Sequence, residues 1–323
     1  MNEKIDIVAC TDKFYVMPTG VMMLSVCENN PDTDIVFHII LEDNVKAEDR
    51  RDLENVVAPY RGKSLAFYNV NERMLKMSFP VGAKLHITKA AYYRLFLSEL
   101  LPQDIDKVLY LDGDLIVRHS LLPLWEIDLG EHAIAAAHDG SSGVIEFYNR
   151  LKYPFELGYF NSGVLLINLK YWREHQVVKV FESYMEKHAN VIKYHDQDVL
   201  NVVFCEKKIL IPIKYNLQHG FLEKKSMTYD YWKLEHEVLE ARQDPYIVHF
   251  TFRDKPWRKY QIESHPFSST WDKYQNMTKW KGIKFEHRAM KMRRSNCFWN
   301  FLRKIGLVSP LLKIDYLEIA PID

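Results

Sequence analysis

Two aspartates separated by one glycine follow a short apolar run at 108–111, in the order Asp112, Gly113, Asp114. In an extended chain, side chains two residues apart point to the same side, so both carboxylates face one ligand. Gly113 leaves room for that ligand to approach the backbone. Paired carboxylates of this kind bind a divalent cation. A purely structural Asp-Gly-Asp turn is the competing interpretation, and the motif alone does not decide between the two.

A histidine from a distant part of the chain is a third candidate ligand. His249 lies near the end of the apolar run 246–250, and Lys255 follows six residues later. One imidazole beside two carboxylates makes a mixed nitrogen and oxygen set, which suits Mn²⁺ better than Mg²⁺ because magnesium prefers oxygen ligands. Lys255 can neutralise a phosphate. A single histidine at a strand end is more often a hydrogen-bonded structural residue, so only the combination indicates a metal site.

The elements that position these residues are predicted from apolar runs of strand length that alternate with helical patterns. Because few runs show polar alternation, they predict strands buried on both faces, hence a mostly parallel sheet flanked by helices such as 45–57 and 171–188. The segment 88–101 is predicted as a helix that leads into the strand before Asp112. The predicted strands are 5–9, 35–41, 65–70, 108–111, 134–137 and 164–169. The fold class is α/β, in which ligands bind beyond the carboxyl ends of the strands.

The composition narrows the class of protein. The 323 residues are 47% hydrophobic, which indicates a globular chain with a sizeable core, and 43 basic residues balance 43 acidic ones. This balance gives no global field that favours nucleic acid. The four cysteines form no metal-binding spacing, which fits reduced thiols in the cytoplasm. We expect neither a secretory signal nor a membrane-spanning segment.

The C-terminal part of the sequence is strongly basic, unlike the balanced charge of the whole chain. Residues 281–306 contain eight Lys and Arg against one Glu, a local excess of seven positive charges. Phe298, Phe301, Leu302 and Ile305 share one face of a helix by their spacing. An ordinary packed helix with a solvated basic face is one interpretation. Attachment to anionic lipid is the other, and we favour it because basic and aromatic residues on an amphipathic helix suit that interface.

Six ordered motifs over about residues 5 to 257 resemble glycosyltransferase family 8, which includes glycogenin and bacterial lipopolysaccharide α-galactosyl- and α-glucosyltransferases. The metal-binding candidates Asp112 and Asp114 form the Asp-x-Asp motif of this resemblance. The matching segments are IVACTD at 7–12, YYRL at 92–95, VLYLDGD at 108–114, FNSGVLLIN at 160–168, HDQDVLN at 195–201, and His249 with KPW at 255–257.

The resemblance implies a GT-A fold, that is, a Rossmann-like mostly parallel sheet, and the sequence itself predicts a C-terminal subdomain and a basic amphipathic tail. The GT-A domain would span 1–270, with a nucleotide-sugar part at about 1–115 and an acceptor part at about 116–270, and the tail would span 271–323. The implied activity is that of a metal-dependent hexosyltransferase (EC 2.4.1 type). It would use a UDP-hexose and Mn²⁺, with Mg²⁺ as the alternative ion, and retain the anomeric configuration. The expected acceptor is a saccharide or lipid-linked saccharide of lipopolysaccharide or another surface glycan, and the expected location is the inner face of the membrane.

The resemblance also implies a role for each matching residue. Asp112, Asp114 and His249 would bind the metal, and Lys255 would hold the diphosphate. The uridine would contact Cys10, Thr11 and Asp12. The donor sugar would contact Arg94, Asp139, Asn161 and Ser162. Beneath the anomeric carbon would lie Asp196 and Gln197. Several have structural alternatives: Arg94 as a helix-surface charge, Asn161 as a turn residue, and Asp196 and Asp198 as first-turn acids of a helix.

Two mechanisms can transfer the sugar with retention, and they differ in the group that attacks the anomeric carbon. A retaining glycosidase places a carboxylate nucleophile there, whereas this chain has Gln197, a neutral amide. We therefore expect attack by the acceptor hydroxyl on the face from which the diphosphate leaves, with Asp198 as a transient nucleophile in the alternative. One residue departs from the family pattern: Phe252 stands where a glycine is common after the metal-binding histidine.

Two functions of other classes stay open at this point. A phosphatase of the haloacid dehalogenase type would use Asp112 as nucleophile and Asp114 as acid. A non-catalytic protein that docks on membranes and binds saccharides would bind its ligand without releasing UDP.

Overall fold

A seven-stranded sheet forms the centre of the computed structural model, which describes residues 4–70, 74, 77, 79–80, 90–223, 232–251, 255–259, 265–285, 305 and 307. The strand order is β3-β2-β1-β4-β7-β6-β8. The strands are β1 (Lys4–Thr11), β2 (Asp34–Leu41), β3 (Lys63–Asn69), β4 (Lys107–Leu111), β6 (Ile134–His138), β7 (Phe160–Asn168) and β8 (Lys208–Leu210). All neighbours are parallel except β7, which is antiparallel to both β4 and β6. The predicted α/β class with a mostly parallel sheet is confirmed, and each of the six predicted strands belongs to this sheet.

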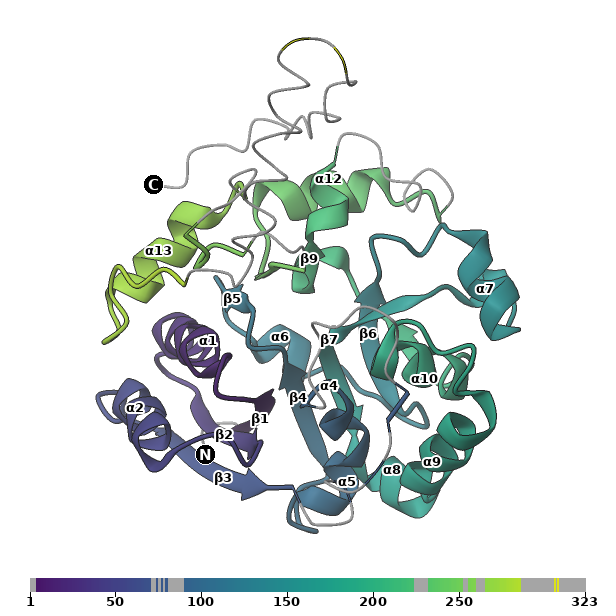
Figure 1. Cartoon of the computed structure of the whole chain (residues 1–323), viewed down its shortest axis with the longest axis horizontal. Helices are drawn as coiled ribbons and strands as arrows, with labels where there is room; N and C mark the ends of the chain where they lie inside the picture. Colours follow the sequence, from purple (N-terminus) through teal and green to yellow (C-terminus); the bar gives the residue numbers. More distant parts are fainter. Residues whose placement is uncertain are drawn as a thin grey trace.

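Helices cover both faces of the sheet (Figure 1). One face packs its apolar side chains, among them Ile7 and Phe37, in a core with α1 (Val16–Asn29), α2 (Ala47–Val57) and α13 (Ser268–Asn276). The other face, with Val8 and Tyr110, packs in a core with α5 (Leu97–Leu100), α8 (Leu169–Glu174), α9 (Val177–His188) and α10 (His195–Val203). Strands buried on both sides have no polar face, which explains runs without alternation.

A small second sheet brings a distant residue to the end of β4. Its order is β5-β10-β9, from β5 (Leu115–Val117), β10 (Ile247–His249) and β9 (Leu217–Gln218). β5 begins directly after Asp114, and His249 pairs with Leu115 in the antiparallel ladder. The register therefore sets the histidine beside the acidic pair, although 135 residues separate it from Asp114.

The described residues contain further short elements that connect these layers. They are α4 (Ala90–Tyr93), η1 (Arg94–Phe96), α6 (Leu122–Trp125), α7 (Ile145–Leu151), η2 (Phe155–Leu157), η3 (Ile213–Tyr215), η4 (His219–Leu222) and α12 (Glu235–Gln243).

Two predicted helices are interrupted. The segment predicted as one helix at 88–101 forms α4, η1 and α5 in its described part, because Phe96 leaves helical geometry at φ −109° and ψ 11°. The segment 171–188 is divided between α8 and α9, where Gln176 adopts a left-handed backbone with φ 49°. Helix α1 was not predicted.

The expected boundary between domain and tail at 270/271 lies within a helix of the structure. It falls inside α13, where Trp271 and Tyr274 pack into the main core. Lys284 also donates to the Pro256 carbonyl oxygen (2.8 Å). The packed domain therefore continues to residue 285. The predicted amphipathic helix at 298–305 lies outside the described residues, apart from Ile305, which is exposed.

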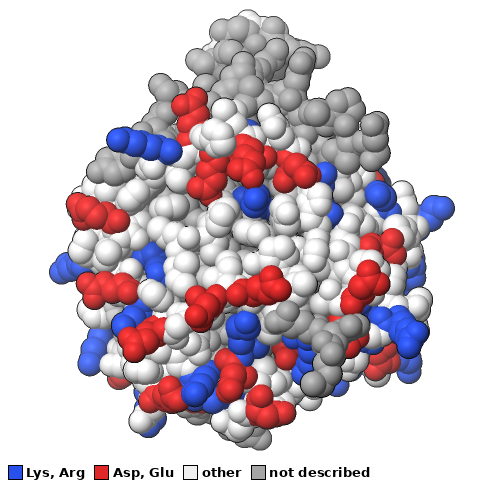
Figure 2. All heavy atoms as spheres, turned by 180° about the vertical axis from the view of Figure 1, so that it is seen from behind, with Lys and Arg blue, Asp and Glu red and all other residues white. Residues whose placement is uncertain are grey.

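Two surface properties bear on partners. No helix among the described residues combines the length and the apolar character that spanning a bilayer requires. Acidic and basic side chains are interspersed over the face seen in Figure 2, and the described residues form no continuous basic area on it.

Candidate active site

The two carboxylates that follow β4 meet the imidazole at the end of β10. His249 Nε2 lies 3.1 Å from Asp114 Oδ1 and 3.7 Å from Asp112 Oδ2. One ligand atom from each of the three residues lies within 4.8 Å of the other two. Atoms at this spacing can all contact one cation between them, and the set of two carboxylates and one imidazole suits a divalent metal.

Asp112 is held so that one oxygen stays available. Its Oδ1 accepts hydrogen bonds from Arg94 Nη2 (2.8 Å) and from the Tyr110 hydroxyl (2.9 Å). Its backbone N–H donates to the Gly163 carbonyl oxygen on the neighbouring strand β7 (2.8 Å). These contacts leave Oδ2 directed at His249, which is the geometry expected of a metal ligand with a fixed second oxygen.

Asp114 carries a stable negative charge. Burial alone would raise the pKa of its carboxyl group, but Lys255 and His249 outweigh this and hold the pKa well below its usual value. Lys255 Nζ donates to Asp114 Oδ2 (2.7 Å). Lys255 thus brings a positive charge to the edge of the candidate metal site.

A glycine gives this cluster its space. A Cβ on Gly163 would lie 2.1 Å from His249 Cε1 and 2.8 Å from Asp112 Oδ2. Contacts that short are not tolerated, so any other residue at this position would displace both side chains. A glycine at this position therefore lets His249 and Asp112 come together, and the donor set that results fits a divalent cation.

A second polar group lies at the ends of β6, β7 and α10. Asn161 Nδ2 donates to Asp139 Oδ2 (3.1 Å) and to Gln197 Oε1 (3.2 Å), and Gln197 Nε2 donates to the same Asp139 oxygen (3.2 Å). The Ser162 N–H also donates to Gln197 Oε1 (3.1 Å). The amide oxygen of Gln197 therefore already accepts two hydrogen bonds.

Arg94 joins the metal candidates to Asp196. It is 5% exposed and donates from Nη1 to the Ser162 carbonyl oxygen (2.6 Å). Its Nε–H donates to the Ala91 carbonyl oxygen (3.0 Å), so its 3.1 Å approach to Asp196 Oδ2 is an ionic contact. That buried carboxylate oxygen accepts no hydrogen bond from the described residues. Because buried acceptors are normally satisfied, it suits a hydroxyl group of a ligand.

The ionised carboxylate of Asp196 is expected to reduce the stability of the protein at neutral pH. Burial is the largest cause that raises the pKa of its carboxyl group, to about 6. The folded protein then holds this proton more tightly than the unfolded chain, so the carboxyl contributes stability that is lost as pH rises from about 4 to about 6. The Asp196→Asn variant should raise the free energy of unfolding by about 3 kcal/mol at pH 7 and by less than about 1 kcal/mol near pH 4, where the carboxyl of the folded protein is protonated. Urea unfolding at both pH values measures this, and an equal effect at both would contradict it.

Asp198 has different surroundings, although it follows two residues later on α10. Its side chain is fully buried, and its oxygens accept from two Arg150 nitrogens (2.6 and 3.0 Å) and from the Tyr159 hydroxyl (2.8 Å). The N–H groups of Lys193 and Tyr194 add two more hydrogen bonds (2.7 and 2.8 Å). Five donors occupy the carboxylate, so these contacts are those of a structural residue that fixes the start of α10.

The end of β1 and the residue after it lie at the same sheet edge as Asp112, because β1 and β4 are parallel neighbours. Asp12 Oδ1 accepts from the N–H groups of Phe14 (2.8 Å) and Tyr15 (3.0 Å) before α1 begins. The Thr11 hydroxyl is buried and accepts from Thr19 Oγ1 (3.1 Å). Burial raises the pKa of the Cys10 thiol to about 12, which keeps it neutral. The strand order changes direction between β1 and β4, which is where open α/β sheets bind ligands.

Asn216 was missed by the sequence analysis. It is fully buried, and its Oδ1 lies 3.0 Å from His249 Nδ1. The only feature of the sequence that could have indicated it is the position of this strongly polar residue directly between Tyr215 and Leu217. The family glycine position occupied by Phe252 lies outside the described residues.

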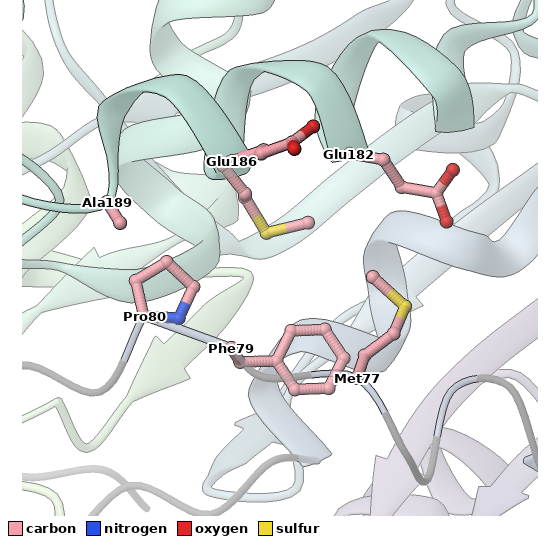
Figure 3. A pocket seen from close by; sticks show the side chains of 7 residues that line it. Met77, Phe79, Pro80, Glu182, Glu186 and Ala189 are labelled. Carbon is pink, nitrogen blue, oxygen red and sulfur yellow. The ribbon is translucent and has the colours of Figure 1, made fainter.

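A separate cavity of about 450 Å³ lies between α9 and the segment that carries Phe79 and Pro80 (Figure 3). Glu182 and Glu186 project from the helix on one side of it. None of the predicted site residues lines this cavity. Its lining consists of Met77, Phe79, Pro80, Glu182, Met185, Glu186 and Ala189.

Comparisons with known proteins identify relatives over most of the chain. Residues 6–261 match the model of glycosyl transferase family 8. General stress protein A of Bacillus subtilis is 27% identical over 285 residues, which cover 87% of this chain and 96% of that protein. The lipopolysaccharide 1,3-galactosyltransferase of Salmonella typhimurium is 27% identical over 266 residues, 80% of this chain and 74% of that enzyme. A crystal structure of the galactosyltransferase LgtC with donor and acceptor sugar analogues has a TM-score of 0.72 and 28% identity, and covers 90% of this chain and 99% of that one.

Proposed function

Because the chain belongs to glycosyl transferase family 8 and has the GT-A fold, we propose that this transferase moves a hexose from a UDP-sugar to a saccharide acceptor with retention of configuration. UDP-galactose and UDP-glucose are the proposed donors. The observation that carries the proposal is the convergence of Asp112, Asp114 and His249 at the end of β4. The lipopolysaccharide galactosyltransferase relative supports an acceptor in lipopolysaccharide or another surface glycan.

The proposed cofactor is Mn²⁺, with Mg²⁺ as the alternative. Asp112 Oδ2, Asp114 Oδ1 and His249 Nε2 would hold it, and the imidazole favours manganese. When bound, the ion supplies positive charge that neutralises the diphosphate as it departs. Lys255, paired with Asp114 at 2.7 Å, adds a second positive charge at the same place.

The residues around Arg94 would bind the donor sugar. Asp196 offers a buried carboxylate oxygen without a hydrogen-bond donor among the described residues, which suits a sugar hydroxyl. Arg94 is buried among its own partners, so it would orient Asp112 and Asp196 together. Asp139, Asn161 and Gln197 would form the adjoining wall of the sugar site. Cys10, Thr11 and Asp12, at the edge next to β4, would receive the uridine.

The reaction is proposed to proceed by front-face attack. The acceptor hydroxyl attacks the anomeric carbon on the face from which UDP departs, and its proton passes to the departing diphosphate. Gln197 is a neutral amide whose oxygen accepts two hydrogen bonds, so we give it a positioning role. The five donors around Asp198 leave it no free oxygen for a nucleophilic role in this arrangement.

Release of UDP tests the function directly. We expect UDP release from one UDP-hexose in a panel, with Mn²⁺, which increases when the correct saccharide acceptor is added. A phosphatase would instead release phosphate from simple esters with Mg²⁺ and without need of His249. A non-catalytic saccharide-binding protein would bind without releasing UDP. Either result would replace the proposed function.

We also propose that the basic segment 281–306 attaches the enzyme to anionic lipid at the inner face of the membrane, close to a lipid-linked acceptor. The excess of seven positive charges supports this, because each Lys or Arg near such a surface contributes about 1 kcal/mol. The intact chain should sediment with vesicles that contain anionic lipid, and less so in high salt. Since the packed domain continues to residue 285, the variant lacking 286–323 is the appropriate comparison. Equal sedimentation of both forms would contradict the proposal.

A further inference from the structure

A buried asparagine connects the metal candidates with the sugar-site group. Asn216 is 0% exposed and lies directly before β9. Its Oδ1 lies 3.0 Å from His249 Nδ1, and its Nδ2 donates to Asn161 Oδ1 (3.0 Å). A side-chain amide with both ends engaged in the protein interior has one orientation only, provided that its partners are themselves fixed.

The orientation of Asn161 is fixed by groups that cannot change roles. The backbone N–H of Gly163 can only donate, and it donates to Asn161 Oδ1 (2.9 Å). The other end, Nδ2, faces a carboxylate oxygen of Asp139 (3.1 Å). Since a carboxylate accepts, the amide nitrogen must be on that side, and the oxygen of Asn161 must face both Gly163 and Asn216.

The same reasoning passes along the chain of hydrogen bonds to the histidine. Because Asn161 presents an oxygen to Asn216, Asn216 must present its NH₂ group to Asn161 and its oxygen to His249. That oxygen accepts, so the proton of the ring lies on His249 Nδ1. When a cation is bound and the imidazole is neutral, the lone pair of the ring therefore lies on Nε2, the nitrogen that faces Asp114 Oδ1 at 3.1 Å and Asp112 Oδ2 at 3.7 Å.

We propose that Asn216 is a positioning residue that selects the metal-binding tautomer of His249 and couples the metal site to the sugar site through Asn161. A ligating histidine is normally oriented in this way by a partner on its other nitrogen. Asn161 also donates to Gln197 Oε1 (3.2 Å), so one connected set of amides reaches from the imidazole to the sugar-site group. This inference rests on the metal site of the proposed function and adds a residue to it.

Two substitutions separate the two connections of Asn216. In Asn216→Ala both are lost, and Mn²⁺ affinity of the protein without donor should fall by about 10- to 100-fold. In Asn216→Asp the carboxylate still accepts from His249 Nδ1, so Mn²⁺ affinity should stay within about threefold of wild type. It cannot donate to Asn161, so binding of the UDP-hexose should weaken instead. Free Mn²⁺, measured by electron paramagnetic resonance, gives the first affinity, and KM for the donor reports the second connection.

The tautomer is measured independently. In protein with ¹⁵N-labelled histidine and Mg²⁺, long-range proton–nitrogen correlations should place the proton of His249 on Nδ1, and Asn216→Ala should lose this state. A proton on Nε2 in the wild type would overturn the inference, as would equal Mn²⁺ affinities in Asn216→Ala and wild type, or equal losses in both variants. If the affinities and the tautomer follow expectation while no UDP-sugar is turned over, the proposed function fails and the inference stands.

Discussion

Replacement of Asp112 with asparagine is expected to reduce sugar transfer by about three orders of magnitude or more. Arg94 Nη2 and the Tyr110 hydroxyl both donate to Asp112 Oδ1, so the amide oxygen of the variant must take that position. The NH₂ group then replaces Oδ2 and directs two hydrogens at the space beside His249 Nε2. The variant therefore loses a negative charge and also presents a donor where the cation requires an acceptor.

Gln197→Ala is the matched control for this experiment. Gln197 lies in the adjoining polar group, and a neutral amide whose oxygen accepts from Ser162 and Asn161 is a weak nucleophile. This variant should retain measurable transfer with unchanged Mn²⁺ affinity, whereas Asp112→Asn should lose both. The rate of UDP release at saturating donor, with thermal unfolding to verify the fold, distinguishes them. Equal and total loss in both variants would favour covalent catalysis through Gln197 or its neighbours.

Gly163→Ala should also reduce both sugar transfer and Mn²⁺ affinity, as Asp112→Asn does, although it changes no charge. The added methyl group would lie 2.1 Å from Cε1 and 2.7 Å from Nδ1 of His249, and 2.8 Å from Asp112 Oδ2. The ring has little freedom to withdraw, since Asn216 holds Nδ1 and β10 is paired on both sides. We expect transfer to fall by at least about 100-fold, because displacements near 1 Å have this effect on aligned groups. Mn²⁺ affinity should fall in parallel.

A glycine with open surroundings provides the control. At Gly130 a Cβ would meet no atom within 4 Å, but the residue has a positive φ of 48°. Gly130→Ala should therefore reduce stability by about 1 kcal/mol through backbone strain alone and leave transfer unchanged. Mn²⁺ titration of both variants measures the difference. Normal Mn²⁺ affinity in Gly163→Ala would show that this glycine does not border the metal site.

The strands were predictable because burial on both faces leaves continuous apolar runs in the sequence, as in β1 and β2. Helix α1 was not, for the same physical reason. Twelve residues of α1 are buried, so apolar side chains surround it, and a helix without a polar face has no 3.6-residue pattern to detect. Its Pro18 and Gly20 also weaken any helix prediction based on propensity.

The members of the candidate site were predictable as residue types, and their separate roles were not. Asp196 and Asp198 are both acids in the first turn of α10, and nothing in their spacing distinguishes them. Long-range partners do so in the fold, because Arg150 and Tyr159 saturate Asp198 while an oxygen of Asp196 accepts no hydrogen bond from the described residues. The contact of Asn216 with His249 likewise depends on the pairing of β9 with β10.

A crystal structure with Mn²⁺ and UDP tests the central claim most directly, because manganese is identified by its anomalous scattering. The account predicts one anomalous peak bounded by Asp112 Oδ2, Asp114 Oδ1 and His249 Nε2, with diphosphate oxygens completing the coordination and Lys255 beside them. A peak at another place, or UDP bound while these three side chains point away from one another, would contradict the account.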